Sequence, residues 1–422
     1  MKQSPFWVEE HPRPENITSD LPGEADVLIV GSGLTGLTAA LRLSRGGKSV
    51  VVVDSGEIAS GASSVNGGMV SPDIKAGIKV IFDQHGPELG KEMWHATVRS
   101  VDIVSDLATS ESIDAMMMRG GMAALGTGPD AQARFEQSVS WYREHVGVDW
   151  EVLGPGRVGE VIGGGPFTTA IFEPEGFGIQ PARFVFGLAS RVAAAGAVLV
   201  ANCEAISFDK EGSGFRVATS RGPVKAGDIV LATNGYTTDR PSGELARRIV
   251  PVGSYIIVTE AIPDRAAEIF PGGAMTYTKK RLLNYMRRTP DGRVLIGGRR
   301  NLHTGLDLAE SAASLQSQLV GYFPQLEGVP LTHVWGGKLA VPFDLIPHIG
   351  QVDGAWYALG YAGHGVGLST LMGHELAGML LGEERPSVFT KVPHPTRFYY
   401  RGNPWFLTPA SILYRTLDRL NR

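Results

Sequence analysis

The sequence has little of what several large classes of protein depend on. Its 422 residues include one cysteine, Cys203, which excludes intrachain disulfides and multi-cysteine metal sites and fits a reducing cytoplasm. The net charge of −4 leaves no basic field to hold a nucleic acid. No apolar run approaches the roughly 18 residues of a membrane span, and the first residues lack the apolar stretch of a secretion signal. We therefore expect a cytoplasmic protein with no transmembrane segment and no nucleic-acid partner.

Motifs for three other chemistries are also missing. The histidines form no helical i, i+4 pair, so we predict no metal site. There is no G-x-S-x-G motif to support serine hydrolysis. Gly47-Lys48-Ser49 looks like the end of a phosphate-binding P-loop, but Arg42 stands where that motif requires a glycine. None of these three chemistries is therefore supported.

Glycine, in contrast, is abundant, with 55 residues, and three glycines form a pattern. The run ADVLIV-GSGLTG-LTAALRLSRGGKSVVVVDSG from Ala25 reads as strand, glycine turn, helix and second strand. Gly31 makes the tight turn, Gly33 lets a pyrophosphate approach the backbone, and Gly36 lets helix and strand pack closely. Asp54 ends the second strand, 54 − 36 = 18 residues after Gly36, where a carboxylate accepts hydrogen bonds from a ribose and disfavours NADP. The predicted dinucleotide-binding residues are Gly31, Ser32, Gly33, Leu34, Thr35, Gly36, Asp54 and Ser55.

A second loop of small residues, GEIASGASSVNGGMVSP, follows the ribose acid directly, over residues 56–72. A nicotinamide enzyme would normally continue into another crossover helix here. A small-residue loop suits a backbone that wraps around an extended ligand, although a flexible surface loop has the same composition. The loop favours a flavin dinucleotide, and its predicted ligand contacts are Gly61, Ala62, Ser63, Asn66, Gly67, Gly68 and Met69.

The run from Val30 to Gly68 resembles the amine-oxidising branch of the FAD-dependent D-amino acid oxidase (DAO) superfamily, which includes γ-glutamylputrescine oxidoreductase-like proteins and glycine and sarcosine oxidases. Two later stretches resemble the same family. One comprises GFGIQPARFVFGLASRVAAAGAVLV (residues 176–200) and AGDIVLATNGYT (residues 226–237). The other, residues 335–382, contains IPHIG and GYAGHGVGLSTLMGHELAG. These blocks cover most of the chain and occur in the family's order.

This resemblance implies an α/β fold, with a Rossmann-like doubly wound FAD-binding domain and an inserted α+β substrate domain built on an antiparallel sheet. The discontinuous FAD-binding domain would comprise residues 1–85, 171–244 and 335–385. The substrate domain would comprise 86–170 and 245–334. Residues 386–422 would form a C-terminal docking arm, whose helical spacing of Leu413, Leu417 and Leu420 also allows a weak membrane-surface or partner contact.

The cofactor implied by the resemblance is FAD. It would be held noncovalently, because Cys203 is the only cysteine and the covalent attachment of some sarcosine oxidases uses a late one. In the closing segment a glycine-rich turn again leads into a helix N-terminus, whose dipole would stabilise negative charge on a reduced flavin. Further FAD contacts are expected from Ala205, Thr233, Asn234, Gly235, Gly363, His364, Gly365, Val366, Gly367 and Leu368.

The implied reaction is oxidation of a C–N bond of a small amine, amino acid or γ-glutamyl-polyamine. Hydride would pass to flavin N5, giving an imine that hydrolyses. The electron acceptor would be O₂ or another compound, because our placement puts Leu295 where sarcosine oxidases carry an oxygen-activating lysine. An FAD-binding electron-transfer or non-catalytic subunit of a larger complex is the alternative.

Four residues are candidates for the chemistry, each with a plainer alternative. His364 would orient the amine, or only hydrogen-bond to backbone or flavin. Asp344 would receive a cationic amine, or is an exposed turn residue. Tyr285 and Arg287, two apart in a strand-like run and so on one face, would provide an aromatic wall and a carboxylate clamp. The alternatives are a core tyrosine and a surface arginine.

Overall fold

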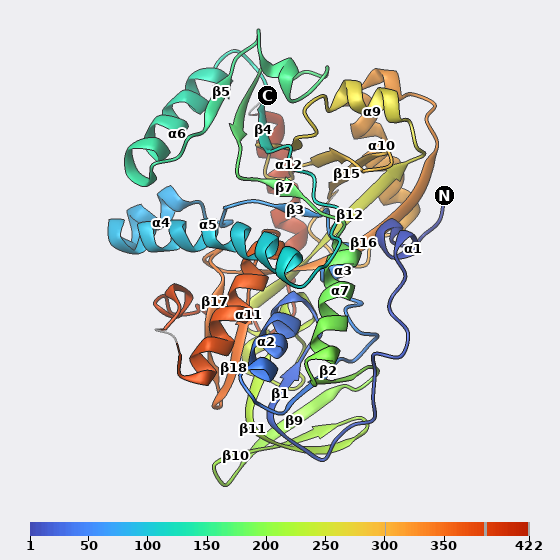
Figure 1. The fold of residues 1–422 in the computed structure, drawn as a ribbon. Coiled ribbons are helices and arrows are strands. Elements are labelled where there is room, and N and C mark those ends of the chain that lie inside the picture. Colours follow the sequence, from blue (N-terminus) through green and yellow to red (C-terminus); the bar gives the residue numbers. More distant parts are fainter. Residues whose placement is uncertain (300, 384–385, 421–422) are drawn as a thin grey trace.

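The computed structural model describes residues 1–299, 301–383 and 386–420 and has two lobes, the second above the first in Figure 1. Each lobe is built on one eight-stranded sheet. The first sheet is largely parallel and the second largely antiparallel. The expected fold class, a Rossmann-like α/β domain with an inserted antiparallel domain, is confirmed.

The first sheet has the strand order β17-β18-β11-β1-β2-β8, and β11 also pairs with β10, which pairs with β9. Neighbours from β18 to β8 run parallel. Both faces of β1 and β2 are buried, which explains their unbroken apolar sequences. The strands are β1 (Glu24–Val30), β2 (Val50–Val53), β8 (Val198–Val200), β9 (Ala205–Glu211), β10 (Gly214–Thr219), β11 (Gly222–Leu231), β17 (His348–Val352) and β18 (Ala355–Leu359).

Helices cover one face of this sheet (Figure 1). They are α2 (Leu34–Arg45), α7 (Pro181–Ala194) and α11 (Gly365–Leu381), and α5 (Pro87–Ser110) packs against α11. On the opposite face, Phe215 and Val217 of β10 pack against side chains of β1 and β2. Strand β1, helix α2 and strand β2 thus form the βαβ unit that the glycine pattern predicts.

The second sheet has the order β16-β12-β15-β14-β13-β4-β6-β5. Its neighbours are antiparallel except for β13 and β4, which run parallel. One face packs against α9 (Pro263–Ile269) and α10 (Leu308–Tyr322), and the other faces the first lobe. The strands are β4 (Met122–Gly126), β5 (Glu151–Leu153), β6 (Thr169–Glu173), β12 (Ile249–Thr259), β13 (Met275–Thr278), β14 (Tyr285–Arg288), β15 (Val294–Gly298) and β16 (Leu331–Pro342).

Two strands of the second sheet extend beyond the expected domain boundaries. β16 pairs with β12 along its whole length, up to the pair Ile249 and Pro342, so the first sheet resumes only at β17 and not at residue 335. β6 likewise continues to Glu173 in the second sheet. Resemblance between blocks of sequence does not reveal strand pairing, which decides the lobe to which a connecting strand belongs.

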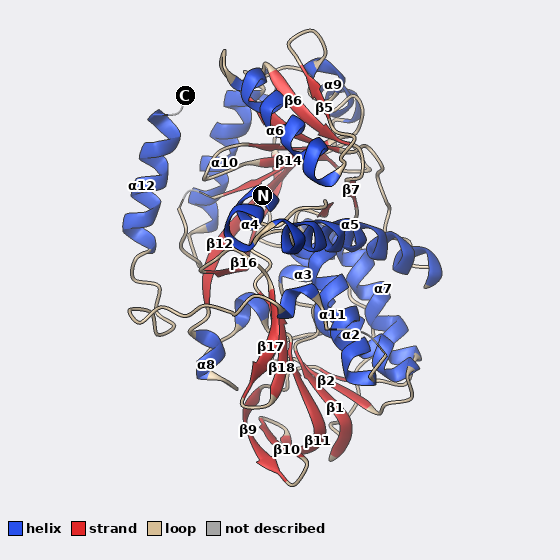
Figure 2. Cartoon of the chain, turned by 90° about the vertical axis from the view of Figure 1, so that its left-hand side faces the viewer, coloured by secondary structure: helices blue, strands red, loops and turns tan. Residues whose placement is uncertain are grey.

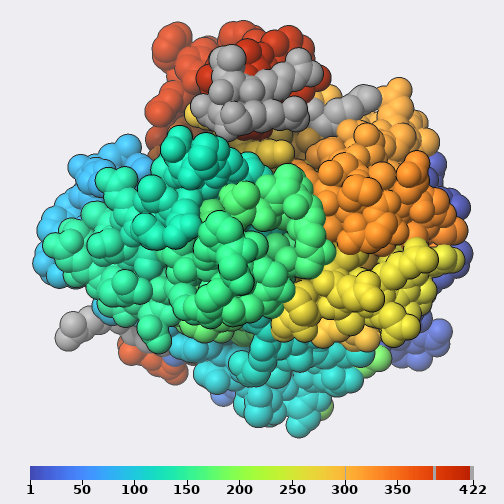
Figure 3. Space-filling model, turned by 90° about the horizontal axis from the view of Figure 1, so that it is seen from above, coloured from blue at the N-terminus to red at the C-terminus, as the bar shows by residue number. Residues whose placement is uncertain are grey.

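The C-terminal segment ends in α12 (Leu407–Leu420), at the side of the second lobe (Figure 2) and at its edge when seen from above (Figure 3). The hydroxyl of Ser411 accepts a hydrogen bond from the Leu302 N–H at 3.0 Å. The carboxylate of Asp418 accepts bonds from the N–H groups of Arg281 and Leu282 at 3.0 Å each. These contacts dock the helix. Residues 384–385 and 421–422, and the side chain of Leu420, lie outside the described part of the chain.

The exposed face of α12 includes Ile412 and Leu413, and its contact with a membrane surface stays a prediction. No helix in the described part of the chain is both long and apolar enough to cross a membrane.

The remaining elements are α1 (Phe6–Glu10), α3 (Ala62–Val65), β3 (Met69–Val70), α4 (Ile78–His85), α6 (Ala131–Val146), η1 (Val158–Glu160), β7 (Phe177–Gly178), η2 (Asn234–Tyr236), α8 (Gly243–Ala246), η3 (Pro324–Leu326) and η4 (Val388–Thr390).

Candidate active site

A cavity of about 1670 Å³ is lined by residues of both lobes. Sites for a drug-sized molecule usually measure about 300–1,000 Å³, so this one has room for a dinucleotide and a further ligand. The first lobe contributes the start of α2, the loop after β2 and the start of α11. The second lobe contributes side chains from its inner sheet face. The cavity therefore connects the predicted dinucleotide site with the second lobe.

The glycines between β1 and α2 have the close contacts that the motif predicts. Gly31 has a φ of +107°, and a Cβ there would lie 2.7 Å from the carbonyl oxygen of Ala232. A Cβ on Gly36 would lie 2.0 Å from the carbonyl oxygen of Gly31. Gly33 is the N-cap residue of α2 and lines the cavity. The open N-terminus of α2 at the cavity wall fits the pyrophosphate of a dinucleotide.

Asp54 lies in the cavity wall just after β2, where a ribose acid is expected. Its Oδ2 accepts hydrogen bonds from the backbone N–H of Ser32 at 2.8 Å and from the Ser32 hydroxyl at 2.5 Å. Its Oδ1 accepts one from the Gly56 N–H at 3.0 Å. These bonds fix the carboxylate and leave acceptor capacity for a ribose hydroxyl.

The second small-residue loop is held by internal bonds. Asn66 donates to the carbonyl oxygens of Ala62 and Ser63, and its Oδ1 accepts from the Gly68 N–H at 2.7 Å. Ser63 accepts a bond from the N–H of Leu34 at 3.0 Å, which joins the loop to the first turn of α2. These bonds and the place of the loop in the cavity wall favour a ligand-binding loop over a flexible surface loop.

Arg287 does not clamp a carboxylate, which corrects the sequence prediction. Its side chain is 1% exposed and does not line the cavity. The Nη1 group donates to the carbonyl oxygens of Gly67 at 3.2 Å, Gly68 at 2.9 Å and Ile179 at 2.9 Å. Burial lowers the pKa of Arg287 to about 10. The guanidinium acts as an internal brace for the loop that carries Gly67 and Gly68.

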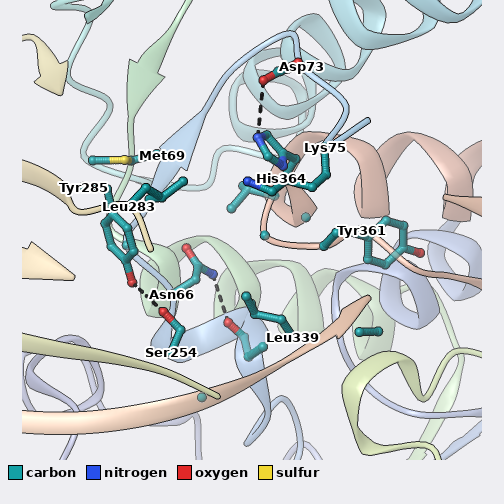
Figure 4. A pocket seen from close by; sticks show the side chains of 18 of the residues that line it. Asn66, Met69, Asp73, Lys75, Ser254, Leu283, Tyr285, Leu339, Tyr361 and His364 are labelled. Atoms are coloured by element: carbon teal, nitrogen blue, oxygen red, sulfur yellow. Dashed lines mark hydrogen bonds and ion pairs between the residues drawn. The ribbon is translucent and has the colours of Figure 1, made fainter. Parts of the chain in front are cut away.

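Tyr285 lies in the cavity wall, as an aromatic wall requires. Its ring packs against two glycines, since a Cβ on Gly67 would lie 2.8 Å and a Cβ on Gly297 2.0 Å from ring atoms. The Tyr285 hydroxyl lies 3.3 Å from the hydroxyl of Ser254 (Figure 4). The two glycines therefore set the position of this ring.

His364 is the N-cap residue of α11 and also lines the cavity. Its Nε2 lies 3.4 Å from Oδ2 of Asp73 (Figure 4). Burial raises the pKa of the Asp73 carboxyl, but contact with His364 and the charge of Lys279 outweigh this and hold it below its ordinary value. The Nδ1 atom is buried without a hydrogen-bond partner among the described residues. Asp73 thus orients the ring of His364 in the cavity wall.

Asp344 and Leu295 are not in the cavity wall, which for Asp344 favours the alternative of a turn residue. Asp344 accepts a bond from the Ile346 N–H at 3.1 Å and lies 3.0 Å from Nε2 of His348, so it stabilises a turn. Leu295 is fully buried in the apolar layer between the second sheet and the first lobe. Its correspondence to the lysine of sarcosine oxidases stays a prediction.

Most residues predicted to contact FAD line the cavity. They are Gly31, Gly33, Leu34, Thr35, Asp54, Ser55, Gly61, Ala62, Ser63, Asn66, Gly67, Met69, Ala205, Thr233, Asn234, Gly363, His364, Gly365, Val366 and Gly367. Five others lie behind the wall: Ser32, Gly36, Gly68, Gly235 and Leu368. Ser32 braces Asp54, and a Cβ on Gly235 would lie 2.8 Å from the carbonyl oxygen of Lys338. Contact of these five with FAD stays a prediction.

Sequence reasoning missed the polar residues of the second lobe and of the loop after β3. They line the same cavity: Asp73, Lys75, Glu173, Ser254, Tyr277, Lys279 and Arg299. The Nε atom of Arg299 is buried and without a partner in the described part of the chain, and burial lowers the pKa of this guanidinium. Alternation along β13 and β14 was the available signal, but the pairing of these strands was unknown. The described residues contain no cluster of three or more potential metal ligands.

Comparison with known proteins identifies the family. The model of the DAO family, described as FAD dependent oxidoreductase, matches residues 26–379. Gamma-glutamylputrescine oxidoreductase of Escherichia coli K12 is 29% identical over 372 residues, which cover 87% of each chain. Glycine oxidase of Pseudomonas putida is 26% identical over 381 residues, 85% of this chain and 95% of the relative.

Solved structures show the same fold. Glycine oxidase from Geobacillus kaustophilus superposes with a TM-score of 0.75 at 21% identity, covering 90% of this chain and 100% of that one. L-proline dehydrogenase from P. horikoshii gives a TM-score of 0.71 at 20% identity, with 87% and 96% covered. With the family match over residues 26–379, the chain belongs to the DAO family of FAD-dependent oxidoreductases.

Proposed function

We propose that the protein oxidises a C–N bond of a small amine, an amino acid or a γ-glutamyl-polyamine. The observation that carries this proposal is the single cavity that joins the dinucleotide glycines to a polar face of the second sheet. The names of two relatives, gamma-glutamylputrescine oxidoreductase and glycine oxidase, point to the same class of substrate. The single buried cysteine supports a reducing compartment such as the cytoplasm.

The first lobe would hold FAD without a covalent bond. The N–H groups at the start of α2 would receive the pyrophosphate and Asp54 a ribose hydroxyl. Cys203 is buried in the core of the first lobe and does not line the cavity, which supports noncovalent binding. Bound FAD supplies the acceptor for two electrons.

His364 is the residue best placed to act on the amine. With Nε2 held by Asp73, the His364 ring would contact the substrate amine from the cavity wall and orient it. The substrate then loses hydride from its α-carbon and a proton from nitrogen. Water adds to the resulting imine and releases ammonia and a carbonyl compound.

For an amino acid substrate, Arg299 replaces Arg287 as the candidate for binding the carboxylate. It lines the cavity, and within the described residues it has no carboxylate within 4.0 Å. A guanidinium presents a planar pair of donors that matches a carboxylate. Tyr285 and Arg299 line the same cavity, so the two side chains would contact the same ligand.

The test is product formation by the FAD-loaded protein with a panel of amines, amino acids and γ-glutamyl-polyamines. Each compound is incubated with O₂ or with a dye acceptor, and ammonia and the carbonyl product are measured by mass spectrometry. We expect equal amounts of both from at least one class of compound, and the productive acceptor distinguishes an oxidase from a dehydrogenase. A yellow protein that forms neither product with any compound would support the electron-transfer subunit instead.

A further inference from the structure

The inner face of the second sheet presents a row of polar side chains to the cavity. Tyr277 on β13 pairs with Tyr285 on β14, and Tyr285 pairs with Gly297 on β15. On the other side of β13, Met275 pairs with Met122, which pairs with Glu173 on β6. Paired residues and residues two apart along a strand share a face. Glu173 and Tyr277 therefore lie on the face that carries Tyr285.

Glu173 is a buried carboxylate with an incomplete set of partners. It is 5% exposed and lines the cavity, and its Oε1 accepts a hydrogen bond from the Tyr277 hydroxyl at 3.0 Å. No cation lies within 4.0 Å of it among the described residues. Burial raises the pKa of Glu173 to about 7. A buried carboxylate without a counterion is costly unless a ligand provides one.

Lys279 follows β13 and lines the same cavity. Its Nζ lies 5.2 Å from the centre of the Tyr277 ring, and its charge lowers the pKa of both Glu173 and Asp73. In the part of the chain that the structure describes, it has no carboxylate within 4.0 Å. The Glu173 carboxylate and the Lys279 ammonium thus line the same cavity without forming an ion pair.

We propose that Glu173 and Lys279 bind the amino-acid headgroup of a bifunctional substrate. Glu173 accepts hydrogen bonds from the headgroup ammonium, and Lys279 pairs with its carboxylate. This assignment rests on the proposed amine oxidation and places the reacting amine at the other end of the substrate, beside His364. A simple monoamine bound beside His364 has no carboxylate for Lys279 and no second ammonium for Glu173.

Charge complementarity favours a zwitterion over a ligand with one charge. An added cation alone would pair with Glu173 but would be repelled by Lys279. An added anion alone would pair with Lys279 but would be repelled by Glu173. A neighbouring ammonium and carboxylate offset both charges at once. The ammonium has three donors, and Glu173 is oriented by its bond from Tyr277.

Calorimetric titration of the FAD-loaded protein with γ-glutamylbutylamide tests this assignment. The compound carries the headgroup but has no terminal amine to oxidise. The Nα-acetyl and α-carboxamide forms each remove one headgroup charge. Glu173→Gln and Lys279→Met are the test variants. Glu175→Gln is the matched control, because Glu175 bonds to Trp150 and does not line the cavity.

We expect Glu173→Gln to raise the Kd of the parent compound roughly 10- to 100-fold and to leave that of the Nα-acetyl form unchanged. Lys279→Met should weaken the parent compound but not the α-carboxamide, and Glu175→Gln should behave as wild type. Equal losses for all three compounds, or no loss, would overturn the assignment, as would bleaching of the flavin by the butylamide. Because binding is measured without turnover, a failure of amine oxidation would be recognised separately.

Discussion

Replacing Arg287 with methionine separates an internal brace from a carboxylate clamp. The guanidinium contacts the carbonyl oxygen of Arg288 through Nε and those of Gly67, Gly68 and Ile179 through Nη1. Because Nη1 carries two hydrogens, these contacts amount to three hydrogen bonds. Hydrogen bonds from a charged donor contribute about 1.5–3 kcal/mol each, or roughly 5–9 kcal/mol together. Burial opposes this, since it lowers the pKa of Arg287 from 12.5 to about 10, which corresponds to about 3 kcal/mol. The net expectation is a loss of about 2–6 kcal/mol of unfolding free energy.

The assay is urea denaturation of wild type and Arg287→Met at one fixed, saturating FAD concentration, because bound FAD itself shifts the apparent stability. FAD affinity should also fall, since the braced loop lines the cavity. Arg299→Met is the matched control, for which we expect nearly unchanged stability but weaker binding of carboxylate substrates. An Arg287→Met protein with wild-type stability and a raised KM only for carboxylate substrates would refute the brace and restore the clamp.

Three further predictions follow from contacts in the cavity wall. Gly36→Ala places a Cβ 2.0 Å from the Gly31 carbonyl oxygen, so FAD affinity, measured by fluorescence titration, should fall at least about tenfold; wild-type affinity would contradict this close packing. Gly297→Ala places a Cβ 2.0 Å from the Tyr285 ring and should weaken substrate binding more than FAD binding; equal losses would show that the ring is not a substrate wall. Burial raises the pKa of Glu173 from 4.5 to about 7, so the folded state binds this proton more tightly than the unfolded state. The resulting contribution to stability is fully present below pH 4.5 and is lost as the pH rises through 7. The free energy of unfolding, measured by urea denaturation, should therefore fall more between pH 5 and pH 8 in wild type than in Glu173→Gln, by on the order of 3 kcal/mol. Equal falls in the two proteins would contradict the assigned burial of Glu173.

The parts of the site that depend on local sequence were predictable. Gly31, Gly33 and Gly36 adjoin one helix start, and Asp54 lies one strand later, so a single βαβ unit determines their positions. The helix after Gly363 follows from an equally local glycine turn. The parts that depend on pairing between distant strands were not predictable.

Arg287 and Arg299 show the difference. Arg287 lies in a strand-like sequence and Arg299 directly follows one, and no local pattern says which of them faces the cavity. Arg287 is a brace because β14 pairs with β15 and because Gly67 and Gly68 pack against its side chain. The place of Asp344 was not predictable for a similar reason, because its partner His348 becomes visible only once the turn before β17 is formed.

The central claim is that an amine delivers electrons to the flavin in this cavity. The most direct test is anaerobic titration of the FAD-loaded protein with amines, amino acids and γ-glutamyl-polyamines, following the visible absorbance of the flavin. We predict stoichiometric bleaching by one class of these compounds in wild type, and slower bleaching in His364→Ala. A flavin that stays oxidised with every compound, in a protein that still binds FAD tightly, would contradict the claim.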